Sequence, residues 1–189
     1  MEAVLKKAQK TGTAETGVFG LRLQGDSLNY FMDQLKLLHP ELNSDVARLN
    51  ATFGETAFIF LSRKNKLEQA ISCVKAMQTG LWHTAANGTE FERLAPPQPP
   101  YFDKEAIRAH IAEFEADEER WKDWFANEDI QPLRLSYDAL ADDPAATLIK
   151  VLKALGLEVP SANAIKTPLA RMADDASKEW AALYRQQLK

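Results

Sequence analysis

The chain has 189 residues, of which 46% are hydrophobic and 26% charged, and its formal net charge is -4. This composition is typical of a soluble globular protein, and its acidic balance argues against a general surface for nucleic acid or an anionic membrane. The single cysteine, Cys73, excludes an internal disulfide framework, and no paired cysteines or HExxH-type spacing indicates a zinc site.

No apolar run approaches the roughly 20 residues of a membrane helix, and the first residues lack the apolar core of a signal peptide. We therefore expect a cytoplasmic protein without membrane insertion, folded as a single domain over 1–189.

The first half of the chain alternates helices with short strands. Apolar spacing and end signals predict, in chain order, a helix at 2–10, a strand at 18–23, a helix from 26 or 27 to 38, one or two helical turns after Ser44, a strand at 56–61 and a helix over about 65–82. The apolar strand "TAFIFL" is of the kind that is covered on both faces of a parallel sheet.

The second half begins with "NGTEFERLAPPQPPY", whose prolines predict a surface loop. After it come a long helix at 103–127, a strand at 131–137, a helix at 143–156 and a terminal helix from about 173. The alternation predicts an α/β fold with a small, mainly parallel sheet flanked by helices. Three strands are few, and they leave long edges around the apolar residues 58–61 unpaired.

Arg63 and Ser72 occupy a position suited to anion binding. Arg63 follows a predicted strand, and Ser72 lies on the helix that comes next, at the edge where parallel α/β sheets bind ligands. A guanidinium grips a phosphate through two parallel hydrogen bonds, and a serine hydroxyl adds a directional one. The same spacing also fits a surface ion pair and a solvated serine, so the residues alone leave both interpretations open.

The segment "FIFLSRKNKLEQAISCVKAMQTGLW" resembles the 3′-phosphate-binding segment of sulfotransferases, which use the sulfonate donor PAPS. Its detail "SRxxxxxQAIS…KAxQTGLW" is similar to the bacterial trehalose 2-sulfotransferase type. The segments "TGVFGLRL", "EERWKDWFANEDIQPLRLSYDAL" and "RMADDASKEWAALYR" agree in order and spacing, so the resemblance covers nearly the whole chain. It implies a P-loop-type sulfotransferase fold.

The resemblance also implies roles for particular residues. Arg63 and Ser72 match the pair that holds the 3′-phosphate, and Tyr137 matches a tyrosine beside the adenine, although the second acidic position of that element is lost here. Arg171 resembles a basic residue that closes over the nucleotide. Arg22 either lies near the transferring sulfonate or pairs with a surface carboxylate.

Two features of the family have no counterpart in this sequence. One is the serine- and threonine-rich P-loop, whose backbone amides would cradle the 5′-phosphosulfate. The other is the carboxylate that serves as general base in the trehalose type. We therefore expect the chain to correspond to the C-terminal two-thirds of the family fold. Trp82 is either a stacking plate for a sugar or a core residue.

The function implied is transfer of a sulfonate from PAPS to a hydroxyl of a carbohydrate or glycolipid, with PAP as product and without a metal. The resemblance also allows for a homodimer. A rival hypothesis is a non-catalytic module that keeps part of a nucleotide cleft. An ATP- or GTP-using enzyme is disfavoured, since the sequence has no GxxxxGK[ST] and ATP lacks the 3′-phosphate for which Arg63 and Ser72 are suited.

Overall fold

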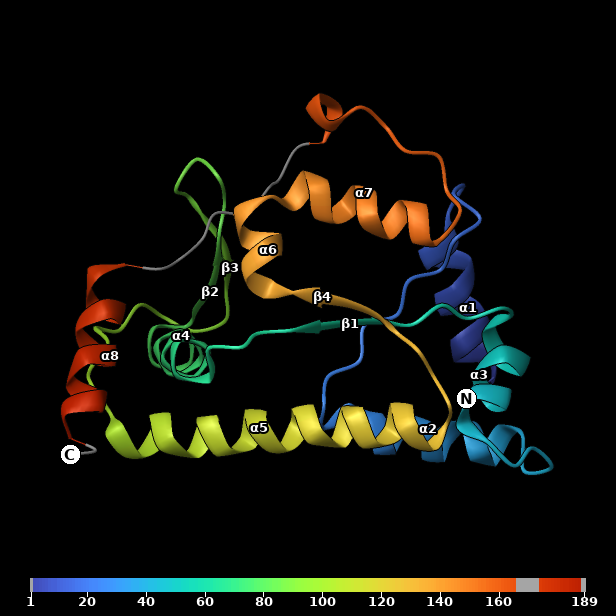
Figure 1. Ribbon diagram of the computed structural model, residues 1–189, viewed down its shortest axis with the longest axis horizontal. Helices are drawn as coiled ribbons and strands as arrows, with labels where there is room; N and C mark the ends of the chain where they lie inside the picture. The colour runs from blue at the N-terminus through green and yellow to red at the C-terminus, as the bar shows by residue number, and fades with distance from the viewer. Residues whose placement is uncertain (1, 166–173, 188–189) are drawn as a thin grey trace. The chain divides into compact units, whose positions relative to one another are not determined.

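The computed structural model describes residues 2–165 and 174–187, which form helices and short strands (Figure 1). Contacts divide the chain into two compact units. Unit 1 comprises Met1–Phe58 and Asp117–Pro132, and unit 2 comprises Ile59–Ala116 and Leu133–Lys189. The prediction of a single domain stays a prediction.

Unit 1 is helical. Its elements are α1 (Glu2–Thr13), α2 (Ser27–Leu38), α3 (Asp45–Phe53) and the last turns of α5 (Lys104–Asn127). Its core consists of buried residues of α2 and α3, with two indoles of α5 packed against them: Leu28, Met32, Leu35, Leu49, Trp121 and Trp124. Ser44 caps α3 by accepting a hydrogen bond from the Ala47 amide, which explains why the helix begins where the sequence predicts.

The strand predicted at 18–23 is wrong. That segment has no regular structure, because Phe19 and Leu23 pack on the helices instead of in a sheet, while Val18 and Leu21 are exposed. The Phe19 ring stacks on Phe53 with centroids 5.6 Å apart, and Leu23 packs against the core of unit 1. An apolar alternation without a neighbouring strand makes no ladder.

Unit 2 combines two small sheets with helices. Its elements are β1 (Ile59–Ser62), α4 (Lys66–Thr79), β2 (Leu81–Thr84), β3 (Glu90–Arg93), the first turns of α5, β4 (Leu133–Ser136), α6 (Tyr137–Asp142), α7 (Pro144–Ala154), the 3₁₀ turn η1 (Ala162–Ala164) and α8 (Asp175–Gln186). β1 and β4 run side by side as a parallel pair, with Ser62 opposite Ser136, and β2 and β3 form an antiparallel hairpin (Figure 1). The predicted α/β class with a small parallel sheet flanked by helices is confirmed.

The strand β1 is less covered than its sequence predicts. Ile59 and Leu61 are 43% and 47% exposed, so one face of the strand is open, and within the described residues β4 is its sole strand partner. The expectation of cover on both faces is therefore wrong. Phe58, predicted as part of the strand, instead belongs to unit 1, where its ring meets Trp124 edge-on at 5.8 Å.

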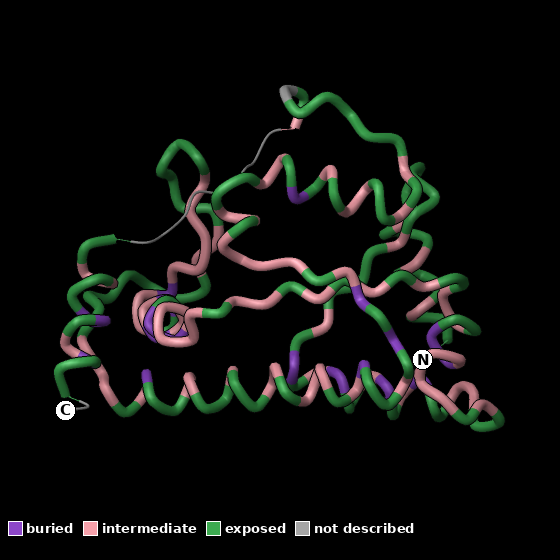
Figure 2. The backbone as a smooth tube through the Cα atoms, viewed as in Figure 1, coloured by how far each residue is buried: buried purple, intermediate pink, exposed green. Residues whose placement is uncertain are grey.

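The core of unit 2 lies between α4, α5 and α8. Its main buried residues are Ile71, Val74, Ile107, Trp180 and Tyr184. Figure 2 shows buried positions along α4. The opposite side of the same helix is thereby left to carry polar residues.

The helix predicted to reach residue 82 ends at Thr79, and the predicted loop after it contains a strand. Gly80 ends the helix in the left-handed region, with φ of 71°, which favours glycine. Leu81 and Trp82 then enter β2, and "EFER" supplies β3. The proline-rich stretch at 96–100 is irregular, as predicted. Across the described parts of the chain, no helix has both the length and the apolar character needed to cross a membrane.

Candidate functional site

Arg63 lies at the carboxyl end of β1, directly before α4. Its Nη2 donates to Glu68 Oε2 at 2.9 Å, and its guanidinium Cζ lies 4.5 Å from the centroid of the Tyr137 ring. The side chain is only 12% exposed. Asn65 caps α4 by accepting from the Glu68 amide at 3.1 Å, which places Glu68 in the first turn, within reach of Arg63.

Sheet register explains why Tyr137 meets Arg63. β1 and β4 are parallel and end at paired residues, Ser62 and Ser136, so the next residue of each chain segment leaves the same edge of the sheet. This is the edge at which parallel α/β sheets bind ligands. Two of the four residues that the family resemblance assigns to the nucleotide, Arg63 and Tyr137, are thus in contact.

Two polar atoms, one just after β1 and one in the first turn of α4, are buried without a hydrogen-bond partner among the described residues. They are the Arg63 Nε donor and the Gln69 Oε1 acceptor. An unsatisfied buried polar atom costs roughly 1–3 kcal/mol, so such atoms are expected to receive a partner that the protein itself does not supply. The Arg63 Nε is a donor on a cation, and its natural partner is an anionic oxygen.

A pocket of about 260 Å³ lies in unit 2, beside the opposite end of α4. Its wall is formed by residues of α4, the β2–β3 hairpin, the proline-rich stretch and the start of α8: Ser72, Lys75, Ala76, Thr79, Leu81, Trp82, Arg93, Pro97, Gln98, Pro100, Asp174 and Ser177. The Ser72 hydroxyl makes no hydrogen bond to any described residue. The Trp82 indole likewise makes no ring contact or hydrogen bond with the described part of the chain.

The charges of the pocket are paired within the protein. Arg93 donates from Nε to Glu90 at 2.6 Å and from Nη1 to the Thr79 carbonyl at 2.5 Å, which ties β3 to the end of α4. Asp174 accepts from Lys75 and from Ser177. Burial raises the pKa of Asp174, but these hydrogen bonds outweigh that effect and hold its pKa at about 2, so the carboxylate is charged at neutral pH.

Comparison with known proteins names the family. Residues 1–187 match the family model described as Stf0 sulphotransferase. The chain belongs to this family.

Two curated relatives of this Stf0 family member carry the name trehalose 2-sulfotransferase. The protein of Mycolicibacterium smegmatis is 27% identical over 179 residues, covering 94% of this chain and 64% of the relative. That of Mycobacterium tuberculosis is 28% identical over 184 residues, covering 93% and 63%. The chain thus spans slightly less than two-thirds of the length of these relatives.

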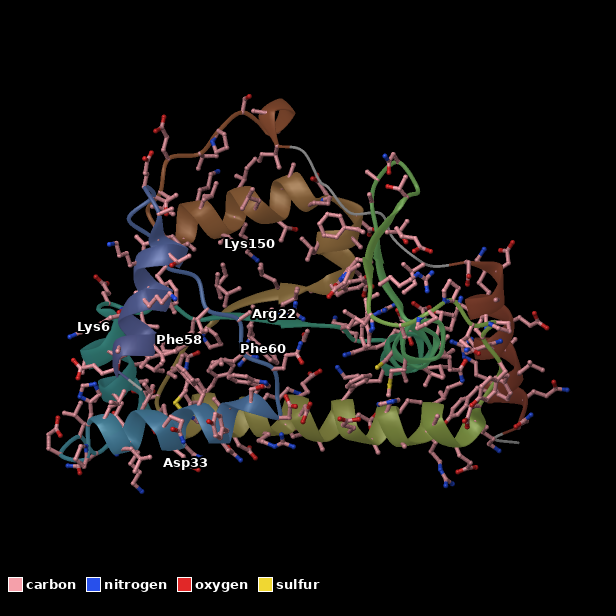
Figure 3. All side chains as sticks on the ribbon, turned by 180° about the vertical axis from the view of Figure 1, so that it is seen from behind. Lys6, Arg22, Asp33, Phe58, Phe60 and Lys150 are labelled. Carbon is pink, nitrogen blue, oxygen red and sulfur yellow. The ribbon has the colours of Figure 1, made fainter. Side chains whose placement is uncertain are left out.

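The structure brings some predicted site residues of this Stf0 family member together and separates others. Arg63 contacts Tyr137, and Ser72 shares a pocket with Trp82, but Arg63 is not part of that pocket's wall. That Arg63 and Ser72 hold one phosphate therefore stays a prediction. Arg22 is exposed in unit 1, on the segment between α1 and α2 (Figure 3), and makes no ion pair with a described residue. Arg171 lies outside the described residues.

Sequence reasoning missed Lys75, Arg93 and Asp174 as pocket residues. Lys75 follows Ser72 by three positions on a helix, so helical spacing alone places the two on one face. No comparable signal was available for Arg93 and Asp174, which reach the pocket from other elements.

Proposed function

We propose that this chain binds PAPS and takes part in sulfonate transfer to a carbohydrate hydroxyl. The observation that carries the proposal is the Arg63 guanidinium at the carboxyl end of β1, which lies over the Tyr137 ring and whose buried Nε has no hydrogen-bond partner among the described residues. A cation with an unused donor fits a phosphate. The aromatic ring beside it fits the adenosine that bears this phosphate.

PAPS supplies an activated sulfonate: its S–O bond to the 5′-phosphate breaks, and a new S–O bond forms to the acceptor oxygen, which loses its proton. In this proposal Arg63 binds the 3′-phosphate, Tyr137 lies on the adenine side, and Ser72 donates its hydroxyl to the same phosphate. Arg171 is proposed to close over the nucleotide, and Arg22 to offset sulfonate charge. We assign no residue as the base.

The proposal of a carbohydrate acceptor is supported by the names of the relatives and by the position of Trp82. Both curated relatives are named for trehalose, so we propose a carbohydrate acceptor, with trehalose as the first compound to try. An indole that lines the pocket and makes no ring contact with a described residue suits a sugar ring. A homodimer stays a prediction that light scattering would test.

Thermal-shift measurements with PAP and ADP test the nucleotide proposal. A larger shift with PAP is expected, since ADP lacks the 3′-phosphate that Arg63 is proposed to bind. A larger shift with ADP would refute the proposal.

Mass spectrometry of trehalose incubated with PAPS and the chain tests turnover. Sulfated product is expected if the chain suffices for catalysis. PAP binding without product would favour the rival hypothesis, a nucleotide-binding module without turnover.

A further inference from the structure

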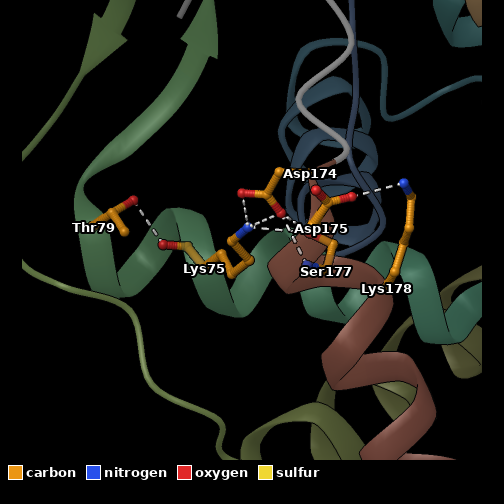
Figure 4. Close-up of polar contacts among 6 residues, drawn as sticks. All are labelled: Lys75, Thr79, Asp174, Asp175, Ser177 and Lys178. Atoms are coloured by element: carbon orange, nitrogen blue, oxygen red, sulfur yellow. Dashed lines mark hydrogen bonds and ion pairs between the residues drawn. The ribbon is translucent and has the colours of Figure 1, made fainter.

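Lys75 presents an ammonium group to the pocket that contains Ser72. The two residues lie three positions apart on α4 and both line the pocket. The Lys75 side chain is only 14% exposed. Its Nζ donates to Asp174 Oδ1 at 2.5 Å and Oδ2 at 2.6 Å, and to Ser177 Oγ at 3.1 Å (Figure 4). Three oxygens thus surround the ammonium, as the oxygens of a phosphate would.

The two members of this ion pair differ in how much they depend on it. Asp174 is 56% exposed and also accepts from the Ser177 amide at 2.9 Å and the Ser177 hydroxyl at 2.7 Å, as the cap of α8. Water and these bonds can satisfy the carboxylate if the lysine leaves. The nearly buried ammonium requires an anion, because a buried charge without a partner is costly.

The remaining groups of the pocket are suited to binding an anion that takes the place of Asp174. Ser72 has a hydroxyl that bonds to no described residue, and Arg93 brings a further positive charge whose acidic partner, Glu90, is not part of the pocket wall. Among the described wall residues, Asp174 is the one acidic side chain. Its displacement from Lys75 would leave a cation and a free donor, three residues apart on one helical face.

We propose that Lys75 binds the 3′-phosphate of the donor nucleotide together with Ser72. In the free protein the Asp174 carboxylate is bound to Lys75, and the phosphate displaces it. This inference rests on the proposed function, because it names a further ligand of the same nucleotide. The Asp174 carboxylate is then a competitor of the phosphate, and its removal favours binding.

A purely structural ion pair between α4 and α8 predicts something different. Breaking such a pair from either side would loosen the same contact, so both variants would change nucleotide affinity in the same direction or not at all. Competition predicts opposite signs. Asp174→Asn keeps a side chain suited to capping a helix and removes only the charge, which isolates the competition.

The test is calorimetric titration of the 189-residue chain with PAP. We expect Lys75→Gln to weaken binding about tenfold, the scale of one charged hydrogen bond, and Asp174→Asn to strengthen it severalfold. The matched controls are Lys178→Gln and Asp175→Asn, from the pair beside it in Figure 4, whose side chains are 78% and 97% exposed. Neither control is expected to change affinity.

Titration with AMP tests whether the two substitutions act through the 3′-phosphate of the nucleotide. AMP lacks the 3′-phosphate, so both substitutions should leave AMP affinity unchanged. Weaker PAP binding by Asp174→Asn, or no effect of Lys75→Gln, would overturn the inference while the proposed function stands. Absence of PAP binding by the unsubstituted chain would overturn the proposed function itself.

Discussion

The guanidinium of Arg63 lies over the ring of Tyr137, with its Cζ 4.5 Å from the ring centroid. The contact follows from the parallel pairing of β1 with β4, which end at the paired residues Ser62 and Ser136. The strands therefore deliver both side chains to one edge of the sheet. The proposed nucleotide site depends on this contact.

Substitution of Tyr137 tests whether its ring or its hydroxyl matters. Because Arg63 contacts the ring face, Tyr137→Phe should keep PAP affinity within about twofold, whereas Tyr137→Leu should weaken it severalfold, the scale of a cation–π contact. Calorimetry with PAP measures both. Equal losses in the two variants would show that the hydroxyl, not the ring, carries the effect.

Trp82→Ala tests whether Trp82 binds the carbohydrate acceptor or the donor nucleotide. If Trp82 stacks on a sugar, the variant should raise the KM for the carbohydrate acceptor about tenfold or more and leave PAP affinity unchanged. Steady-state kinetics and calorimetry provide the two quantities. Because Trp82 shares its pocket with Ser72, the informative contrary result is a loss of PAP affinity, which would assign the indole to the nucleotide instead.

Gly80→Ala should destabilise the chain. The backbone there has φ of +71°, and an added Cβ would lie 2.5 Å from the Ala95 carbonyl oxygen, so a loss of about 1–3 kcal/mol in the free energy of unfolding is expected. Chemical denaturation measures it. Gly20→Ala is the matched control, since nothing lies within 4 Å of its added Cβ and a change below about 0.5 kcal/mol is expected. Equal changes would contradict the close approach at Gly80.

Acid should remove the stability that Asp174 contributes. Its folded-state pKa of about 2 is lower than the ordinary 3.8, so its contribution is present above the ordinary value and is lost as pH falls toward 2. The difference in free energy of unfolding between the unsubstituted chain and Asp174→Asn should therefore shrink between about pH 5 and pH 2. Lys75→Gln should flatten this dependence. A difference that does not vary with pH would contradict the assignment.

Local sequence signals predicted much of the fold. The cap at Ser44 and the apolar stripes place α2 to α5 to within a few residues at most of their ends. The main misses arose where tertiary packing decides. Phe19 and Leu23 pack on helices instead of forming a strand. Leu81 and Trp82 continue the apolar pattern of α4, but the helix ends before them because Gly80 adopts the left-handed conformation. The Asn87-Gly88 pair, a hairpin signal, could have revealed β2 and β3.

Only those site residues that belong to the family motif, or that share a helical face with a motif residue, could be predicted from the sequence. Arg63 and Tyr137 were identified from the family motif. Their contact depends on the register of the parallel β1–β4 pair, which the sequence alone does not predict. The Lys75–Asp174 pair joins residues far apart in the chain, so no local pattern could indicate it. The pocket that Ser72 lines, and the other residues of its wall, became visible only with the fold.

Titration calorimetry with PAP on the unsubstituted chain, Arg63→Ala and Arg134→Ala tests the central claim most directly. Arg134 is exposed on the neighbouring strand, with its Cζ 5.5 Å from the Phe60 ring, and serves as the matched arginine. We expect binding by the unsubstituted chain, affinity at least about tenfold weaker in Arg63→Ala because charge-assisted hydrogen bonds are lost, and no change in Arg134→Ala. No binding by the unsubstituted chain, or equal binding by Arg63→Ala, would contradict it.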